Sequence, residues 1–161
     1  MKTITFLLLG SNLGDRKKNL SVAAKAIGTS VGPVLISSSI YQTGAWGKTD
    51  QPDFLNQALK VQTVLSPENV LANILKIEQS MGRTREVHWG ERIIDIDILL
   101  YGTLTMSSPS LTIPHPQLQN RRFALAPLAE IAGEVIHPTL DLTIQSMLTR
   151  CVDKLDVHKM T

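Results

Sequence analysis

The pattern of apolar and polar residues predicts that the chain begins with a strand. An apolar run covers residues 3–9, and the start of the chain, MKTITFLLLG, superficially resembles a signal peptide. However, the run is short, Thr5 interrupts it, and the polar GSNLGDR that follows holds no small-residue cleavage site. We therefore expect a strand and then a turn at GSN, where Gly10 can take backbone angles that other residues resist.

Two stretches have the apolar spacing of helices. The first covers about 15–27, with Asp15 at its positive N-terminus and Gly28 at its end. The second begins at Ser66 as N-cap, followed by Pro67 at the first helical position, and we expect Gly82 to end it. Its buried face is predicted to consist of the apolar residues Val70, Leu71, Ile74, Leu75 and Met81.

Further strands are predicted at 34–43, at 54–65 and in the isoleucine-rich run that ends at 101. The resulting order over residues 3–101 is β-α-β-β-α-β, which predicts an α+β fold: a ferredoxin-like core with helices packed on one face of an antiparallel sheet. The remaining residues form a C-terminal elaboration, with a helix near 121–132 interrupted or restarted at Pro127 and another near 143–152. They should wrap the same core, so that residues 1–161 form a single domain.

Composition excludes several classes of protein. The chain of 161 residues is 43% hydrophobic and 19% charged, which is typical of an ordered globular domain. A net charge of +2 is too small to indicate a nucleic-acid partner, and no run is long enough to span a bilayer. The single cysteine, Cys151, allows no internal disulfide and suits a reducing cytoplasm, so we expect a cytoplasmic protein that does not bind membranes.

The segment WGERIIDIDILLYG, residues 89–102, places two carboxylates in an apolar strand. Residues two apart share one face, so Asp95 and Asp97 should project together, away from the neighbouring isoleucines. Two like charges at this spacing need neutralisation, and Mg²⁺ favours carboxylate oxygens together with water and substrate phosphates. The D-x-D pattern alone is weak, because an Asp–Arg network on an exposed sheet would look the same.

Arginines before this strand favour a phosphate ligand. Arg83, Arg85 and Arg92 lie immediately before the strand, in a segment with glycines at positions 82 and 90, and guanidinium groups bind phosphate in a fork-like geometry. A loop of ordinary solvated ion pairs remains the alternative. The nearby GAWGKT is not a P-loop, because position 42 is Gln and DQPD follows where a helix is needed.

Other candidates are ambiguous on their own. Phe54 and Phe123 either pack in the core or stack on a flat heterocycle. Asn56 either reads the edge of such a ring or satisfies a strand end, and Trp89 either anchors a loop or belongs to a lid. His115 is fixed between two prolines but is more often structural in such a place, and Glu78 is either a partner for a loop arginine or a helix-edge residue.

Together these segments resemble the 6-hydroxymethyl-7,8-dihydropterin pyrophosphokinase family of folate biosynthesis. The matching pieces run in order and cover most of the chain: GSNLGDR at 10–16, DQPDFLNQ at 50–57, IEQSMGRTRE at 77–86, WGERIIDIDILLYG at 89–102 and IPHPQLQNRRFALAPLAEIA at 113–132. The resemblance implies transfer of pyrophosphate from ATP to the hydroxymethyl group of the pterin, with release of AMP.

The resemblance also implies a role for each matching residue. Asp95 and Asp97 would hold two Mg²⁺ ions, with Asp95 also near the pterin and Asp97 near the reacting groups, and Arg83 and Arg92 would steady the migrating group. ATP would be bound by Arg85, Trp89, Arg92, Ile98, His115 and Arg121. The pterin would be bound by Thr43, Gly44, Ala45, Trp46, Phe54, Asn56 and Phe123.

Three positions of the arginine loop depart from the family pattern: His88 stands where Arg is common, Glu91 where Pro is common, and Ile93 where Thr is usual. Gly44 and Ala45 replace a proline often found in the pterin loop. The expected partners are small molecules, and we expect a monomer. Two other readings remain open: a ferredoxin-like module that binds single-stranded RNA, which the sheet-face carboxylates oppose, and a paralogue that binds pterin without turnover.

Overall fold

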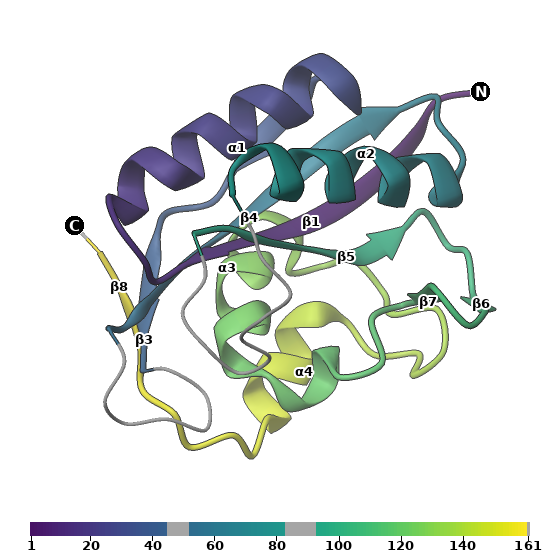
Figure 1. The fold of residues 1–161 in the computed structure, drawn as a ribbon. Helices are drawn as coiled ribbons and strands as arrows, with labels where there is room; N and C mark the ends of the chain where they lie inside the picture. Colours follow the sequence, from purple (N-terminus) through teal and green to yellow (C-terminus); the bar gives the residue numbers. More distant parts are fainter. Residues whose placement is uncertain (45–51, 83–92, 161) are drawn as a thin grey trace.

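The computed structural model describes residues 1–44, 52–82 and 93–160. In this part of the chain, six strands form one antiparallel sheet, and a short hairpin and four α-helices accompany it (Figure 1). The elements in chain order are β1 (Thr3–Ser11), α1 (Arg16–Ser30), β2 (Val34–Ser37), β3 (Tyr41–Thr43), β4 (Phe54–Thr63), α2 (Pro67–Ser80), β5 (Asp95–Tyr101), β6 (Met106–Ser107), β7 (Thr112–Ile113), the 3₁₀ turn η1 (Leu118–Asn120), α3 (Arg122–Ala132), α4 (Ile144–Arg150) and β8 (Val157–Lys159).

The sheet has the order β5-β1-β4-β3-β8, and β2 also pairs with β4. All of these pairs are antiparallel, so the predicted β-α-β-β-α-β core is confirmed. The strand predicted at 34–43 is divided into β2 and β3, which both lie beside β4. The edge strand β8 was not predicted from the sequence, and it extends the sheet beyond β3.

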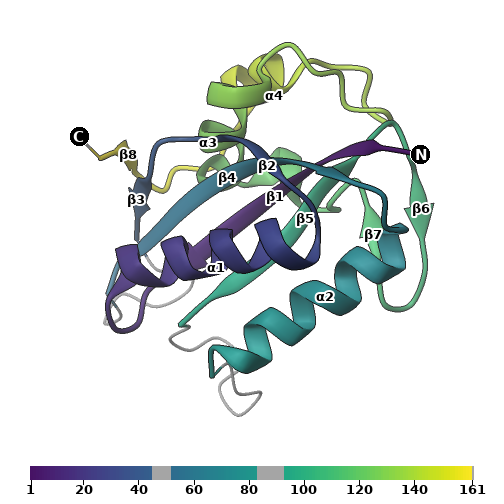
Figure 2. The same ribbon diagram turned by 90° about the horizontal axis from the view of Figure 1, so that it is seen from above.

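The sheet lies between two layers of helices (Figures 1 and 2). Helices α1 and α2 cover one face and bury alternate strand residues, among them Leu7 and Leu9. Helices α3 and α4 cover part of the opposite face, where Phe6 and Leu8 are buried. The C-terminal helices therefore do not join the first core as expected but build a second one. Because of this second layer, residues on this face of the sheet lie beside a helix.

The helices begin where the sequence predicts, but their ends and buried faces differ in detail. Ser66 caps α2, and its hydroxyl accepts a hydrogen bond from the Asn69 N–H at 3.2 Å. Helix α1 passes through Gly28 and ends at Ser30, so the predicted end at Gly28 is wrong. Leu75 was predicted to be buried in α2 and is 48% exposed, whereas Glu78 is 3% exposed.

Helix α3 continues through Pro127 without interruption. The apolar residues of its buried side, such as Leu125 and Leu128, hold this helix against the sheet on both sides of the proline. Within the described ranges, no helix is long and apolar enough to cross a bilayer.

Candidate active site

The two carboxylates of β5 lie on one face of the sheet, as predicted. Ile94, Ile96 and Ile98 are at most 5% exposed and join the core under α1 and α2. Asp95 and Asp97 alternate with these isoleucines and are only partly buried. The strand therefore presents two partly exposed acids on the face opposite to the isoleucine core.

A buried glutamate of α2 fixes the position of β5. The Glu78 carboxylate accepts a hydrogen bond from the Ile96 N–H at 2.7 Å. Because β5 is the edge of the sheet, this N–H points away from β1, and backbone groups two residues along a strand point the same way. The N–H and C=O of Ile98 therefore also face the outer edge, where a flat heterocycle can pair with them.

A row of paired residues crosses the sheet from Asp95. Asp95 lies opposite Gly10 of β1, Gly10 lies opposite Asn56 of β4, and Asn56 lies opposite Tyr41 of β3. Cross-strand partners share a face, so these positions form one continuous surface beside the carboxylates. The row joins residues that are far apart in the sequence, and it explains how Asn56 and Asp95 can belong to one site.

Asn56 is buried without a full set of partners. Its side chain is 3% exposed, and its Nδ2 is a buried donor that has no hydrogen-bond partner among the described residues. A buried unpaired donor costs about 1–3 kcal/mol, so such a group is expected to meet a ligand. This carboxamide is the clearest sign of a binding site for a molecule with an acceptor edge.

Gly10 makes room for the Asn56 carboxamide. It lies within β1, not in a turn as predicted, and it is not among the residues with positive φ. A Cβ at this position would lie 2.8 Å from Asn56 Oδ1 and 3.8 Å from Phe54 Cδ1. Gly10 is therefore required for close approach of side chains, a reason that the sequence pattern alone did not reveal.

The two phenylalanines come from different layers on this side of the sheet. Phe54 begins β4, two residues before Asn56, and Phe123 lies in the first turn of α3. Both side chains are partly exposed. The Arg121 guanidinium lies 5.7 Å from the centre of the Phe123 ring, which is a cation–π distance. Phe54 and Phe123 are thus two partly exposed aromatic rings on the side of the sheet that carries Asn56.

His115 lies near both Arg121 and Asp95. Its backbone N–H donates to the Leu99 carbonyl at 3.0 Å, and its Nδ1 accepts from the Gln117 N–H at 3.1 Å. Burial and, to a smaller extent, the positive charge of Arg121 lower the pKa of His115 to about 4, while Asp95 acts in the opposite direction. His115 is therefore neutral near pH 7, with its proton on Nε2, and can donate one hydrogen bond.

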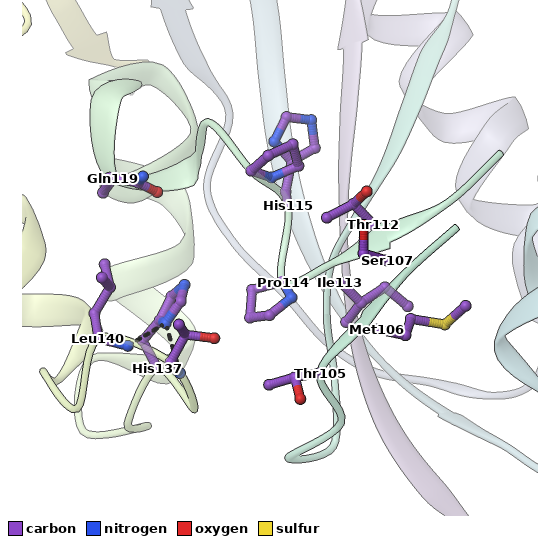
Figure 3. A pocket seen from close by; sticks show the side chains of 12 residues that line it. Thr105, Met106, Ser107, Thr112, Ile113, Pro114, His115, Gln119, His137 and Leu140 are labelled. Carbon is purple, nitrogen blue, oxygen red and sulfur yellow. Dashed lines mark hydrogen bonds between the residues drawn. The ribbon is translucent and has the colours of Figure 1, made fainter. Parts of the chain in front are cut away.

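A pocket of about 460 Å³ opens beside His115. Figure 3 shows His115 and Pro114 on one side of it, and His137 and Leu140 on the other. The Nδ1 of His137 accepts hydrogen bonds from the N–H groups of Thr139 and Leu140, so its ring is held by the loop that it belongs to. The pocket therefore lies between the β6–β7 hairpin and the loop that holds His137.

The remaining predicted residues divide into two groups. Thr43 ends β3 opposite Phe54, is 3% exposed, and donates a hydrogen bond from its hydroxyl to the Asp156 carbonyl at 2.9 Å. Gly44 follows directly and is partly exposed. Several predicted residues lie outside the described residues: Ala45, Trp46, Arg83, Arg85, Trp89 and Arg92.

The donor set on β5 fits magnesium. Among the described residues, no group of three or more His, Cys, Asp or Glu side chains could hold a metal ion, so a metal cage made by this part of the protein is excluded. Mg²⁺ is commonly held by only one or two carboxylates together with water and substrate phosphates. Two partly exposed carboxylates on one strand face match that arrangement.

Comparison with known proteins agrees with this geometry. Residues 6–133 match the 7,8-dihydro-6-hydroxymethylpterin-pyrophosphokinase (HPPK) family. The chain is 39% identical over 156 residues to the 2-amino-4-hydroxy-6-hydroxymethyldihydropteridine pyrophosphokinase of Haemophilus influenzae, covering 96% of this chain and 94% of that protein. It is 42% identical over 136 residues to the enzyme of the same name from Bacillus subtilis, covering 84% of this chain and 81% of that one.

Solved structures show the same fold at low sequence identity. The HPPK-DHPS structure in complex with substrates superposes with a TM-score of 0.73 at 16% identity, covering 92% of this chain and 43% of that longer one. A Plasmodium falciparum HPPK-DHPS structure with pteroate gives a TM-score of 0.75 at 18% identity, covering 93% and 43%. From the family match and the bacterial relatives, we conclude that the chain belongs to the 7,8-dihydro-6-hydroxymethylpterin-pyrophosphokinase family.

Proposed function

We infer that this chain transfers pyrophosphate from ATP to the hydroxymethyl group of 6-hydroxymethyl-7,8-dihydropterin and releases AMP, a step of folate biosynthesis. The observation that carries this inference is the unpaired, buried Asn56 donor in the same sheet row as Asp95. One end of the row can read the edge of a pterin, and the other end carries the acids suited to a phosphate-bound cation. The two reactants would therefore meet above this row.

The pterin would lie between Phe54 and Phe123. Both rings are partly exposed on the same side of the sheet, and Asn56 lies two residues beyond Phe54 on the same strand face. A pterin between the rings would offer its acceptor edge to Asn56 Nδ2. Thr43 and Gly44 lie at the adjoining end of β3, and with Ala45 and Trp46 they would complete the rim of this site.

ATP would bind along the β5 edge. The outward N–H and C=O of Ile98 suit the hydrogen-bonding edge of adenine. His115, whose Nε2 can donate a hydrogen bond, lies near both Asp95 and Arg121, and His115 and Arg121 would contact the phosphates and ribose. We assign Arg85, Trp89 and Arg92 to the same nucleotide, and Arg83 and Arg92 to the migrating group, because planar guanidinium groups pair with phosphate oxygens.

The reaction needs charge neutralisation and alignment more than a covalent helper. The pterin hydroxyl oxygen attacks the β-phosphorus, the bond from that phosphorus to the oxygen shared with the α-phosphorus breaks, and AMP leaves. Asp95 and Asp97 would hold two Mg²⁺ ions, which when bound neutralise the phosphate oxygens and orient the chain of phosphates. The hydroxyl loses its proton in this step, either to Asp97 or to solvent.

Three further features belong to this proposal. A single domain spanning residues 1–161 is supported by two apolar clusters that share one sheet. A cytoplasmic location is supported by the single cysteine, Cys151, which is free in the structure. We also propose that the protein is a monomer.

An assay for AMP tests the function directly. The purified protein is mixed with ATP and 6-hydroxymethyl-7,8-dihydropterin, and AMP is measured with and without Mg²⁺. We expect AMP release that requires both the pterin and the metal. AMP release that is independent of the pterin would contradict the proposed acceptor, and no release under any condition would contradict the reaction.

A further inference from the structure

Glu130 connects helix α3 to the strand next to the proposed pterin site. Its carboxylate accepts hydrogen bonds from the Tyr41 hydroxyl at 2.7 Å, from the Ser39 N–H at 2.8 Å and from the Ser39 hydroxyl at 3.1 Å. The Lys159 ammonium lies 3.7 Å away. One side chain of α3 thus contacts the segment before β3, β3 itself and β8.

The contact with Tyr41 has the geometry of a strong, charge-assisted hydrogen bond. Burial and the adjacent Glu130 carboxylate together raise the pKa of Tyr41 to about 12. Burial alone would raise the pKa of Glu130, but the hydrogen bonds from Tyr41 and Ser39 and the charge of Lys159 lower it overall. Near pH 7 the pair is therefore a neutral phenol donating to a carboxylate, which is among the stronger hydrogen bonds in proteins.

Tyr41 connects Glu130 to Asn56, the residue proposed to bind the edge of the pterin. It lies directly opposite Asn56 in the register of β3 and β4, and Thr43 lies opposite Phe54. Lys159 lies opposite Tyr41 on the other side, so it extends the row from Asp95 to β8. The short strand β3 spans only Tyr41–Thr43 and pairs with β4 and β8, and the contacts of Glu130 with Tyr41 and Ser39 add to the backbone hydrogen bonds that hold it.

Glu130 also lies on the helix that carries the proposed stacking ring. Phe123 and Glu130 are seven residues apart in α3, which is about two helical turns, so they lie on the same side of the helix. Helix α3 therefore contacts the sheet side with Glu130 at one end and presents Phe123 at the other. Movement of α3 relative to β3 would change the spacing between Phe123 and the pair Phe54 and Asn56.

We propose that Glu130 is a positioning residue for pterin binding, which sets the spacing between Phe123 on α3 and the Phe54 and Asn56 wall on β4 through its contacts with Tyr41 and Ser39. The inference rests on the proposed function and deepens it. Glu130 itself does not touch the ligand. Loss of the Glu130 contact should therefore weaken pterin binding selectively. The ATP site along the β5 edge lies at the other end of the row, so nucleotide binding should not depend on Glu130.

The test compares binding of the two ligands to Glu130→Ala. Isothermal titration with 6-hydroxymethylpterin and, separately, with α,β-methylene-ATP and Mg²⁺ gives both dissociation constants. We expect the pterin dissociation constant to rise roughly five- to twentyfold, as expected for loss of a charge-assisted hydrogen bond, while that for the nucleotide changes by less than about twofold. Glu134→Ala is the matched control, because Glu134 is an exposed acid just beyond α3, and it should leave both constants unchanged.

Tyr41→Phe provides a second variant, because it removes only the hydroxyl. It should weaken pterin binding in the same direction, and the double variant Tyr41→Phe with Glu130→Ala should be much less than additive. Normal pterin binding by Glu130→Ala would overturn the proposal, as would equal losses for both ligands, which would indicate general destabilisation. If the wild-type protein itself binds no pterin, the proposed function is contradicted. This result is distinguishable from failure of the Glu130 proposal, because it is obtained without any variant.

Discussion

Replacing Gly10 by alanine should weaken pterin binding while leaving the stability of the fold nearly unchanged. A Cβ at this position would lie 2.8 Å from Asn56 Oδ1, which is closer than real Cβ atoms come to a neighbour, so the carboxamide must move. Gly10 is not among the glycines with positive φ, and alanine in a strand loses less backbone entropy on folding than glycine. We therefore expect the free energy of unfolding to stay within about 1 kcal/mol of wild type.

Pterin binding should suffer much more than stability. Displacement of the carboxamide removes a hydrogen bond to a buried group, which is worth about 1–3 kcal/mol. This loss corresponds to a rise of roughly 5- to 150-fold in the pterin dissociation constant. The constant is measured by isothermal titration with 6-hydroxymethylpterin, and unfolding is followed by circular dichroism in urea.

Gly28→Ala is the matched control for this prediction. Gly28 lies in α1, and an added Cβ would meet nothing within 4 Å. Alanine should stabilise the helix by about 0.5–1 kcal/mol and leave pterin binding unchanged. Wild-type pterin affinity in Gly10→Ala would refute the reasoning that Gly10 makes room for a ligand-reading Asn56.

Two further substitutions test the supports of the site. Glu78→Leu removes the acceptor of the buried Ile96 N–H and should lower the free energy of unfolding by about 1–3 kcal/mol in urea, while Glu78→Gln, which keeps an acceptor oxygen, should lower it less. The pKa of His115 lies at about 4 in the folded protein, below its ordinary value of 6.5, so its contribution to stability is complete above about pH 6.5 and is lost as the pH falls toward 4. In urea unfolding, the free energy of unfolding of His115→Gln should fall less steeply with decreasing pH across this range than that of wild type. The same dependence on pH in both proteins would contradict the lowered pKa of His115.

The features set by local chemistry were predictable from the sequence. Ser66 and Pro67 start α2 because capping and a fixed φ act within a few residues. The alternation of Asp95 and Asp97 with isoleucines placed the acids on one face because a strand has a period of two residues. In both cases the outcome depends only on neighbours along the chain.

Features set by distant contacts were not predictable in this way. Gly10 was assigned to a turn, but its role depends on the side chains of β4, which pair with it in the sheet. Leu75 is exposed and Glu78 is buried because the position of α2 is fixed by the backbone of β5, which offers Glu78 a donor. The second helical layer arises because β1 and β5 are apolar on both faces over part of their length.

The central claim is that Asp95 and Asp97 together hold magnesium beneath the phosphates of ATP. Isothermal titration of α,β-methylene-ATP, with and without Mg²⁺, tests it most directly in the wild-type protein and in Asp95→Asn and Asp97→Asn. We expect tight binding only by the wild type and only with Mg²⁺, and similar weak binding by both variants with or without the metal. Binding by either variant that is as tight and as dependent on magnesium as in wild type would contradict the claim.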